Sequence, residues 1–470
     1  MPSTFFGLNI ASSGLSAYQV ALNTTANNIA NVQTTGYSRQ QSNRVASDAL
    51  LVHQQYGAVG SGVTTLSVKQ IRNQYYDTKY WYNQSSVGLY ETKLSYLQQI
   101  ENYFIDDSSS KGFTTILNTM FNSLDTLKNN ASDVNTRQQF IGSAQNLATY
   151  FNSVSEGLTD IQKGTNDEIK STVQNINAIA EKIAVLNKQI NVIEIQGGYA
   201  NELRDQRALL IDELSEIVPT EVSEVPITDT NHPDEPTGAN YYTVKIGGQV
   251  LVDTYNYETL ECKAREYKVN QTDAAGLYDI KWSKTGNTFN AGGSSMSGTL
   301  KALFDIRDGN NGENFSGLAK VLNSTEVQIT NPSITSIVGV SMPEEGILTI
   351  NGREYAYEGF TFEQDADGNI TSYTFNMKRA LTAEEQARVD GRTASVGTSI
   401  DAMGIPYYMS QMNQFLRSFA TEFNNILKKG VDLDGNSTSG YAFFTGTDTV
   451  TAKMRTGMQS TDLAQTRITS

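Results

Sequence analysis

Residues 169–193 read IKSTVQNINAIAEKIAVLNKQINVI, and the spacing of their apolar residues decides much of the fold. One set of isoleucines repeats at an interval of seven residues and comprises Ile169, Ile176, Ile183 and Ile190. A second set follows three positions later and comprises Thr172, Ile179, Leu186 and Ile193. Two such positions in every heptad predict a coiled-coil-like helix that buries one stripe against another helix.

The residues around this stretch predict a helical hairpin. Residues 134–196 are polar and almost free of helix breakers, and Gly197-Gly198 ends the run. A second helix is expected to begin near Asn201. A glycine turn between two long helices favours an antiparallel pair that packs within the chain. The predicted core of the hairpin comprises Ile169, Ile176, Ile183, Ile190, Leu203, Leu210 and Leu214.

Three charged residues of the second helix, Arg204, Asp205 and Arg207, leave two interpretations open. In the first, they form surface ion pairs, each of which stabilises the fold by about 0.5 kcal/mol. In the second, they anchor this helix to its partner in the hairpin. The first interpretation is the favoured one, and the second remains open.

The first 38 residues contain no Asp, Glu, Lys, Arg or His. Within them, residues 4–35 have helical periodicity, and their apolar residues recur at spacings of three and four. This stripe needs either another segment of the chain or a neighbouring subunit to cover it, and the second option is favoured because no partner segment is evident. The predicted assembly interface comprises Leu8, Ala11, Leu15, Tyr18, Leu22, Ile29 and Val32.

The end of this helix carries a specific motif. Residues 26–40 read ANNIANVQTTGYSRQ. Asparagine side chains can form hydrogen bonds with backbone groups that lack a partner, and glycine can take the positive φ that often ends a helix. The motif resembles the N-terminal signature of the bacterial flagellar axial proteins, which are the rod, hook and hook-associated proteins. Its matching residues are Ala26, Asn27, Asn28, Ala30, Asn31, Thr34, Gly36, Tyr37, Arg39 and Gln40.

Three further segments narrow the resemblance. Residues 201–217, 297–308 and 423–444 contain DQRALLIDELS, SGTLKALFDIRD and FNNILKKGVDLDG…FF. In this order they are similar to segments of the family of flagellar hook-associated protein 1, found at the hook–filament junction. A rod or hook type of axial protein is the nearest alternative, and the long helical hairpin argues against it. A second alternative is an adhesive or binding module in the β-rich regions.

The resemblance implies a structural subunit, not an enzyme. It implies partners that are other copies of the chain in a ring of about eleven, and neighbouring hook and hook-associated proteins. It also implies export by the flagellar type III apparatus, so the protein would be cytoplasmic before export and extracellular on the flagellum afterwards. Full-length family members use an export chaperone that holds a C-terminal helix. No such helix is evident after Phe444, so chaperone binding is expected to be lost.

The expected fold class is α+β and multidomain, a long helical stalk with inserted β-rich outer domains. Four of the eight prolines lie within residues 219–236, which marks a domain boundary. The expected divisions are an assembly helix and linker at 1–70, a helical stalk at 71–218 with 401–446, β-rich domains at 219–308 and 309–400, and a polar tail at 447–470. Two hairpins are predicted in these β-rich domains, at Gly247-Gly248 and Asn351-Gly352.

Composition excludes several kinds of function. The net charge of −15 and the pI near 4.7 disfavour a nucleic acid or membrane partner. The histidines, His53 and His232, have no metal-ligand spacing, and Cys262 lacks an activating neighbour. Residues 365–369 and 432–436 resemble parts of calcium loops but lack the required glycine and glutamate, so we expect turns there. No catalytic residue, metal or cofactor is predicted.

Overall fold

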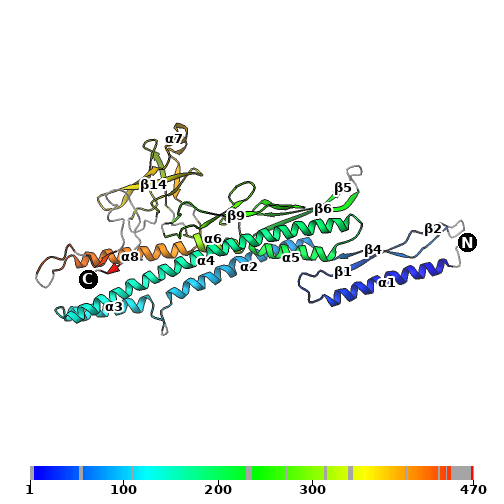
Figure 1. The fold of residues 1–470 in the computed structure, drawn as a ribbon, viewed down its shortest axis with the longest axis horizontal. Helices are drawn as coiled ribbons and strands as arrows, with labels where there is room; N and C mark the ends of the chain where they lie inside the picture. The colour runs from blue at the N-terminus through cyan, green and yellow to red at the C-terminus, as the bar shows by residue number, and fades with distance from the viewer. Residues whose placement is uncertain are drawn as a thin grey trace. The chain divides into compact units, whose positions relative to one another are not determined.

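The computed structural model describes residues 5–51, 57–107, 110–228, 235–270, 272–311, 315–336, 342–396, 400–431, 435–440, 442–445 and 467–468. His53, His232, residues 432–434 and all of the polar tail except 467–468 lie outside this set. The chain forms two compact units, and each is described by itself. The first comprises residues 1–90, 172–261 and 280–300, and the second comprises 91–171, 262–279 and 301–470. Long helices and β-rich regions confirm the α+β fold class (Figure 1).

The first unit begins with a helix beside a hairpin. Helix α1 spans Phe6–Ala30, and strands β1 (Gln40–Ala46) and β4 (Val63–Gln70) pair antiparallel. The short strands β2 (Leu50–Leu51) and β3 (Ala58–Val59) extend this hairpin toward its tip. Helix α1 packs along β1 and β4, as Figure 1 shows at the blue end of the chain.

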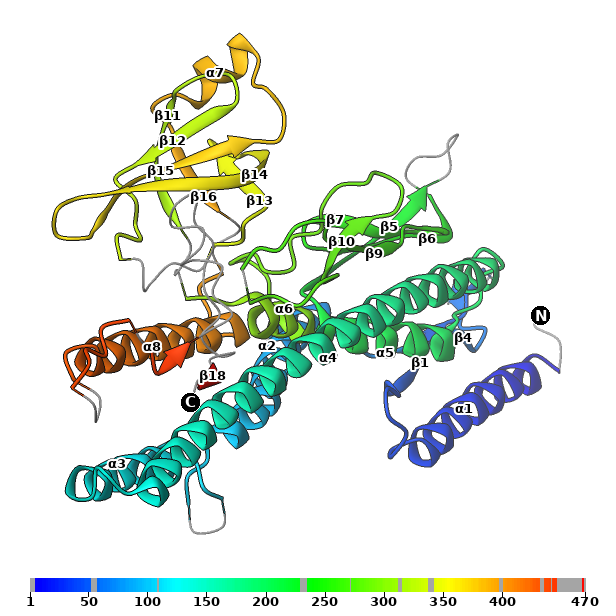
Figure 2. The same ribbon diagram turned by 60° about the vertical axis from the view of Figure 1, so that its left-hand side comes forward.

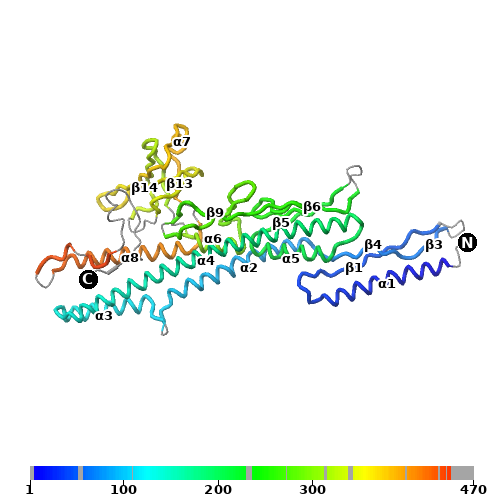
Figure 3. Tube along the Cα trace, in the orientation of Figure 1, coloured from blue at the N-terminus to red at the C-terminus, as the bar shows by residue number. Residues whose placement is uncertain are grey.

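Three helices form the body of the first unit. Helix α2 spans Gln74–Glu101, α4 spans Val134–Glu194 and α5 spans Asn201–Ile217, and the units divide α2 after residue 90 and α4 before residue 172. Helices α4 and α5 are joined by a turn in which Gly197 has a φ of +83° (Figure 3). Such a φ suits glycine because glycine has no Cβ. Of the predicted hairpin core, Leu203 and Leu210 are half-buried and the other five residues are buried, namely Ile169, Ile176, Ile183, Ile190 and Leu214.

A β-layer completes the first unit. Strands β5 (Thr220–Thr228), β6 (Pro236–Ile246), β7 (Gln249–Asp253) and β8 (Asn256–Tyr257) form one antiparallel sheet in that order. The predicted hairpin at Gly247-Gly248 is confirmed by the pairing of β6 with β7. Strands β9 (Leu260–Ala264) and β10 (Tyr278–Trp282) form a separate pair. The units divide both strands, and Cys262, half-buried on β9, belongs to the second unit.

Asparagine side chains of α4 bind the backbone of this β-layer. The amide of Asn177 donates to the Leu260 carbonyl and accepts from the Leu260 N–H, both at 2.8 Å. Asn191 makes the same paired contact with Asn240, at 3.0 Å for both bonds. These side chains satisfy backbone groups that strand pairing leaves free, which explains why a helix beside a sheet carries so many polar residues.

Aromatic packing organises the helices of the second unit. They include a 3₁₀ turn at Asn102–Phe104, α3 (Phe113–Asn129), α6 (Gly298–Asp308, mostly in this unit) and α8 (Ile405–Leu427). The ring of Phe415 on α8 lies 5.3 Å from that of Phe113, and Phe423 stacks at 6.3 Å on Phe140 of α4. The last long helix therefore packs back on earlier helices.

A closed six-stranded barrel forms the other part of the second unit, in the order β11-β12-β15-β14-β13-β16 (Figure 2). Its core combines aliphatic residues with six aromatic ones, among which Tyr357, Tyr373 and Phe375 are fully buried. The predicted hairpin at Asn351-Gly352 and the predicted turn at 365–369 are both confirmed. In chain order the barrel strands are β11 (Ser316–Val321), β12 (Glu326–Thr330), β13 (Gly346–Ile350), β14 (Arg353–Gln364), β15 (Ile370–Met377) and β16 (Thr393–Val396). Helix α7 spans Ala383–Val389. Outside the barrel, β17 (Phe444–Thr445) pairs with β18 (Arg467–Ile468).

Candidate assembly interface

Helix α1 turns its small and polar side toward the hairpin and its apolar side toward solvent. Ala17 and Thr24 are buried against the hairpin side, and the Ser13 hydroxyl accepts from the Val63 N–H at 3.2 Å. The large apolar residues of the predicted interface are 63–73% exposed, and Ala11 is exposed as well; they are Leu8, Leu15, Tyr18, Leu22, Ile29 and Val32. Polar contacts hold the helix in place, so the apolar stripe stays free for another surface.

Asn28 joins the end of α1 to the start of β1. Its carbonyl oxygen accepts from the Gln40 N–H at 2.9 Å and from the Tyr37 hydroxyl at 2.8 Å. Its amide nitrogen donates to the Gln40 carbonyl at 2.8 Å. A single side chain thus replaces a strand partner for Gln40 and fixes the direction in which the chain leaves the helix.

The rest of the motif closes the helix end. The Asn31 amide donates to the carbonyl of Asn27 at 3.0 Å and to its side-chain oxygen at 2.9 Å. Gly36 has a φ of +80°, and a Cβ placed there would lie 3.4 Å from the Cβ of Leu209 on α5. Gln40 is buried, and Tyr37, Gly36 and the three motif asparagines are half-buried. The other four motif residues are exposed, namely Ala26, Ala30, Thr34 and Arg39. The motif therefore serves as a helix stop and a strand start.

Removing the Asn28 side chain is expected to loosen this corner. Asn28→Ala deletes three hydrogen bonds, each worth about 0.5–1.5 kcal/mol, and leaves the Gln40 backbone without these partners. Hydrogen exchange followed by mass spectrometry should show faster exchange of the Gln40 amide. Asn23→Ala on the exposed side of α1 is the matched control and should leave that rate unchanged. Equal rates in both variants would contradict the assigned role of Asn28.

The base of the hairpin is anchored on the first turns of α5. Asp205 accepts from the Ser38 N–H at 3.1 Å and from the Gln70 side chain at 3.3 Å. The Asn201 oxygen accepts from the Gln70 N–H at 3.2 Å, while Glu202 accepts from a side chain of β1. Burial raises the pKa of Asp205, and the bonds from Ser38 offset part of this rise. The surface ion pair proposed for Asp205 is therefore wrong, because its partners are a backbone amide and a neutral side chain.

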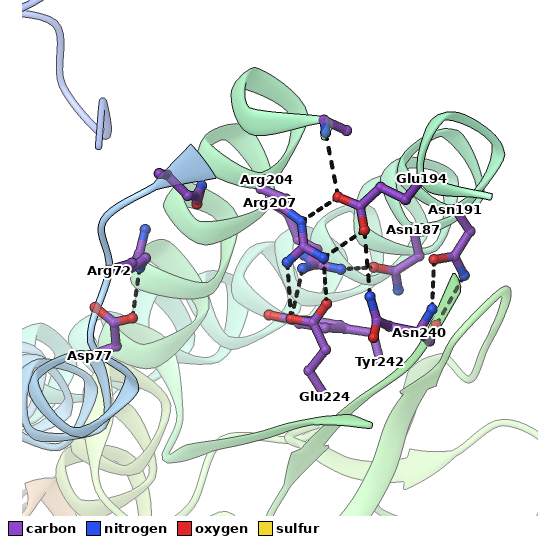
Figure 4. Close-up of polar contacts among 12 residues, drawn as sticks. Arg72, Asp77, Asn187, Asn191, Glu194, Arg204, Arg207, Glu224, Asn240 and Tyr242 are labelled. Atoms are coloured by element: carbon purple, nitrogen blue, oxygen red, sulfur yellow. Dashed lines mark hydrogen bonds and ion pairs between the residues drawn. The ribbon is translucent and has the colours of Figure 1, made fainter. Parts of the chain in front are cut away.

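Arg204 binds the helix with which α5 forms the hairpin. Its guanidinium makes two bonds of 2.7 Å to Glu194 on α4 and an ion pair of 2.9 Å to Glu224 on β5 (Figure 4). Burial alone would lower the pKa of Arg204, but the two carboxylates outweigh this effect and raise it. The second interpretation of the sequence, an anchor to the hairpin partner, is the one that the structure supports for this residue.

Arg207 is the buried centre of the same cluster. It donates to the Asn187 side-chain oxygen at 2.8 Å and to Glu224 at 3.2 Å, and its guanidinium lies 3.5 Å from the centre of the Tyr242 ring (Figure 4). Burial lowers the pKa of Arg207 and raises that of Tyr242 to about 12. The side chain is 5% exposed, so a surface ion pair is wrong here as well.

A cavity of about 230 Å³ lies beside this cluster, and Arg72, Trp81, Arg207 and Tyr242 line part of it. Arg72 pairs with Asp77 at 2.6 Å. The Trp81 indole donates to Asp212 at 2.7 Å, which ties α2 to α5. Across the described ranges, no three His, Cys, Asp or Glu side chains are placed to hold a metal, and no helix is long and apolar enough to cross a membrane.

Comparison with known proteins connects this arrangement to a family. Residues 97–330 match the family model described as "Flagellar hook-associated protein FlgK helical domain". Flagellar hook-associated protein 1 of Bacillus subtilis is 39% identical over 228 residues, which cover 47% of this chain and 45% of that protein. The chain belongs to the family of flagellar hook-associated protein 1. Residues 8–37 also match the flagella basal body rod protein model, which covers the uncharged helix and most of the motif.

A second curated relative and one solved structure are also similar to this chain. Flagellar hook-associated protein 1 of Salmonella typhimurium is 37% identical over 223 residues, 46% of this chain and 39% of that protein. The chain thus spans less than half the length of these two relatives. The flagellar hook junction protein FlgK from Burkholderia pseudomallei is 17% identical, with a TM-score of 0.43 over 70% of this chain and 63% of that chain.

Sequence reasoning missed the partners of the arginines. Asn187, Glu194 and Tyr242 show no motif of their own, and Glu224 lies within the proline-rich boundary as an ordinary strand residue. They meet only because the β-layer folds over the end of the α4–α5 hairpin. The one usable signal was the pair of closely spaced arginines on the side of α5 that carries its leucines.

Proposed function

We propose that the chain is a structural, non-enzymatic subunit of the bacterial flagellum that joins the hook to the filament. Support comes from its family, whose relatives are named flagellar hook-associated protein 1. We further propose export by the flagellar type III apparatus, a cytoplasmic stage before export, with a chaperone in full-length family members, and an extracellular location at the hook–filament junction. The divisions at 1–70, 71–218 with 401–446, 219–308, 309–400 and 447–470 remain part of this proposal.

The observation that carries the proposal is the exposed stripe of α1. Six large apolar side chains lie on one uncharged helix, and polar contacts on its other side hold the helix in place. Burying them would contribute about 9–18 kcal/mol, at about 1.5–3 kcal/mol each. Association costs about 4–15 kcal/mol in lost freedom. The stripe can therefore support contacts with further copies in a ring and with neighbouring hook proteins, with the helical stalk adding to them.

A charge in the stripe tests this function. Leu15 is 71% exposed, so Leu15→Lys should leave the fold intact while it places a cation in the assembly contact. We expect the wild-type chain to co-sediment with isolated hooks of its own organism and the variant to lose at least tenfold in affinity. Ser16→Lys is the matched control, because it adds the same charge at the next exposed position, outside the stripe. Circular dichroism should be alike in all three proteins.

Two results would contradict the proposal. If the wild-type chain does not bind hooks at any concentration, a junction role for these residues fails. If Leu15→Lys and Ser16→Lys bind as well as the wild type, the stripe is not the assembly contact.

A further inference from the structure

An apolar groove of about 550 Å³ lies between α4 and α5 in the first unit. Its apolar lining comes from both helices, and Val185 within it is 51% exposed. Polar and charged side chains form the rest of the lining. The apolar residues are Val185, Leu186, Leu209 and Leu210, and the others are Glu181, Lys182, Gln189 and Gln206. Protein contact surfaces likewise combine apolar side chains with polar ones around them.

The groove adjoins the base of the assembly helix. Leu209 lines the groove and is also the side chain that faces Gly36 just after α1. Val32, the last residue of the exposed stripe, precedes Gly36 by four positions, which a chain spans in about 14 Å at most. The exposed stripe and the groove therefore meet near one corner of the first unit, where a single neighbour could cover both.

Charge limits which surfaces two copies can bring together. The chain carries a net charge of −15, so two copies repel each other over most of their surface. The first 38 residues carry no charged side chain, and the groove lining carries one glutamate and one lysine, which balance. Apart from Arg44, whose guanidinium lies 5.3 Å from the centre of the Tyr18 ring, both surfaces are neutral and apolar, and this combination favours a second copy of the chain as the occupant.

We propose that the α4–α5 groove is a second contact surface for a neighbouring copy of this chain, covered together with the α1 stripe in the assembled ring. The inference rests on the proposed junction function and adds a surface to it. It also explains how assembly gains strength beyond the stripe, whose burial exceeds the cost of association only modestly.

Two exposed valines of α4 make the test. Val185 lines the groove, while Val192 is 54% exposed on the same helix and lies outside the groove lining. Val185→Lys and Val192→Lys therefore add the same charge at matched exposure. Sedimentation equilibrium over a range of concentrations, beside co-sedimentation with hooks, should show at least tenfold weaker self-association for Val185→Lys and an unchanged constant for Val192→Lys. Circular dichroism checks that both variants stay folded.

The outcomes separate this inference from the proposed function. If Leu15→Lys abolishes association and Val185→Lys associates like the wild type, the groove is not a contact surface, and the proposed junction function stands. Equal weakening by Val185→Lys and Val192→Lys also overturns the groove, because the effect would then be one of charge alone. A wild-type chain that neither self-associates nor binds hooks overturns both.

Discussion

Replacing Arg207 by alanine is expected to lower the free energy of unfolding of the first unit by about 3–5 kcal/mol, the usual cost of breaking a buried charge pair. The guanidinium bridges α5 to α4 through Asn187 and to β5 through Glu224, and it covers the Tyr242 ring. Asn187 is 1% exposed, so its oxygen would lose this donor where water has little access. The variant also leaves a void beside the aromatic ring.

The two tryptophans make this loss measurable. Trp81 and Trp282 both belong to the first unit, so tryptophan fluorescence during urea unfolding reports on that unit. Lys245→Ala, an exposed change on β6, is the control and should stay within about 0.5 kcal/mol of the wild type. A similarly small effect for Arg207→Ala would show that the cluster does not hold the β-layer on the helices.

Replacing Asp308 by alanine should destabilise the second unit by a similar amount, about 3–5 kcal/mol. Asp308 is 4% exposed and pairs with Arg307 and Arg265, at 2.7 Å in each case. Arg307 is 0% exposed, so the variant removes the carboxylate partner of a buried cation. Circular dichroism during urea unfolding should show the loss, while tryptophan fluorescence from the first unit changes less. Asp160→Asn is the control, because Asp160 is an exposed residue of α4. An equal loss of stability in that variant would contradict the prediction.

The same carboxylate predicts a dependence on pH. Burial alone would raise the pKa of Asp308, but the charges of Arg265 and Arg307 and the bonds from them outweigh burial and hold the pKa well below its ordinary value. The stabilisation it gives is therefore present above about pH 4, the ordinary range of an aspartate, and is lost as the pH falls toward its folded value. Asp308→Asn should flatten this loss in acid. Asp273 has the opposite dependence on pH, because burial and the charge of Asp308 raise its pKa.

Local pattern was enough for several elements. The hairpins at Gly247-Gly248 and Asn351-Gly352 follow from glycine turns between alternating residues, and the structure pairs their strands as predicted. The helices around residues 134–217 follow from heptads that end at Gly197. Each of these signals lies within a few residues of the element it describes, which is why sequence alone could supply it.

Pairing across long stretches of chain was not predictable in the same way. The barrel closes because β11 pairs with β16, and Ser316 opposite Ser395 belongs to a register that no local pattern records. The residues that are joined by the helix-to-sheet bonds of Asn177 and Asn191 also lie far apart in the sequence. Asparagines in a long helix therefore indicated polarity and nothing about their partners.

Periodicity and the lack of charge are properties of neighbouring residues, so they were enough to predict that α1 is an uncharged helix with one apolar stripe. The side of α1 that faces the hairpin depends on the tertiary structure, through the contacts of Ser13 and Asn28. The tertiary structure also decided that Arg204 and Arg207 are internal anchors, since their partners lie on α4 and β5. A buried polar contact costs much more free energy to break than an exposed surface pair. Burial of this kind arises only when distant segments of the chain pack together.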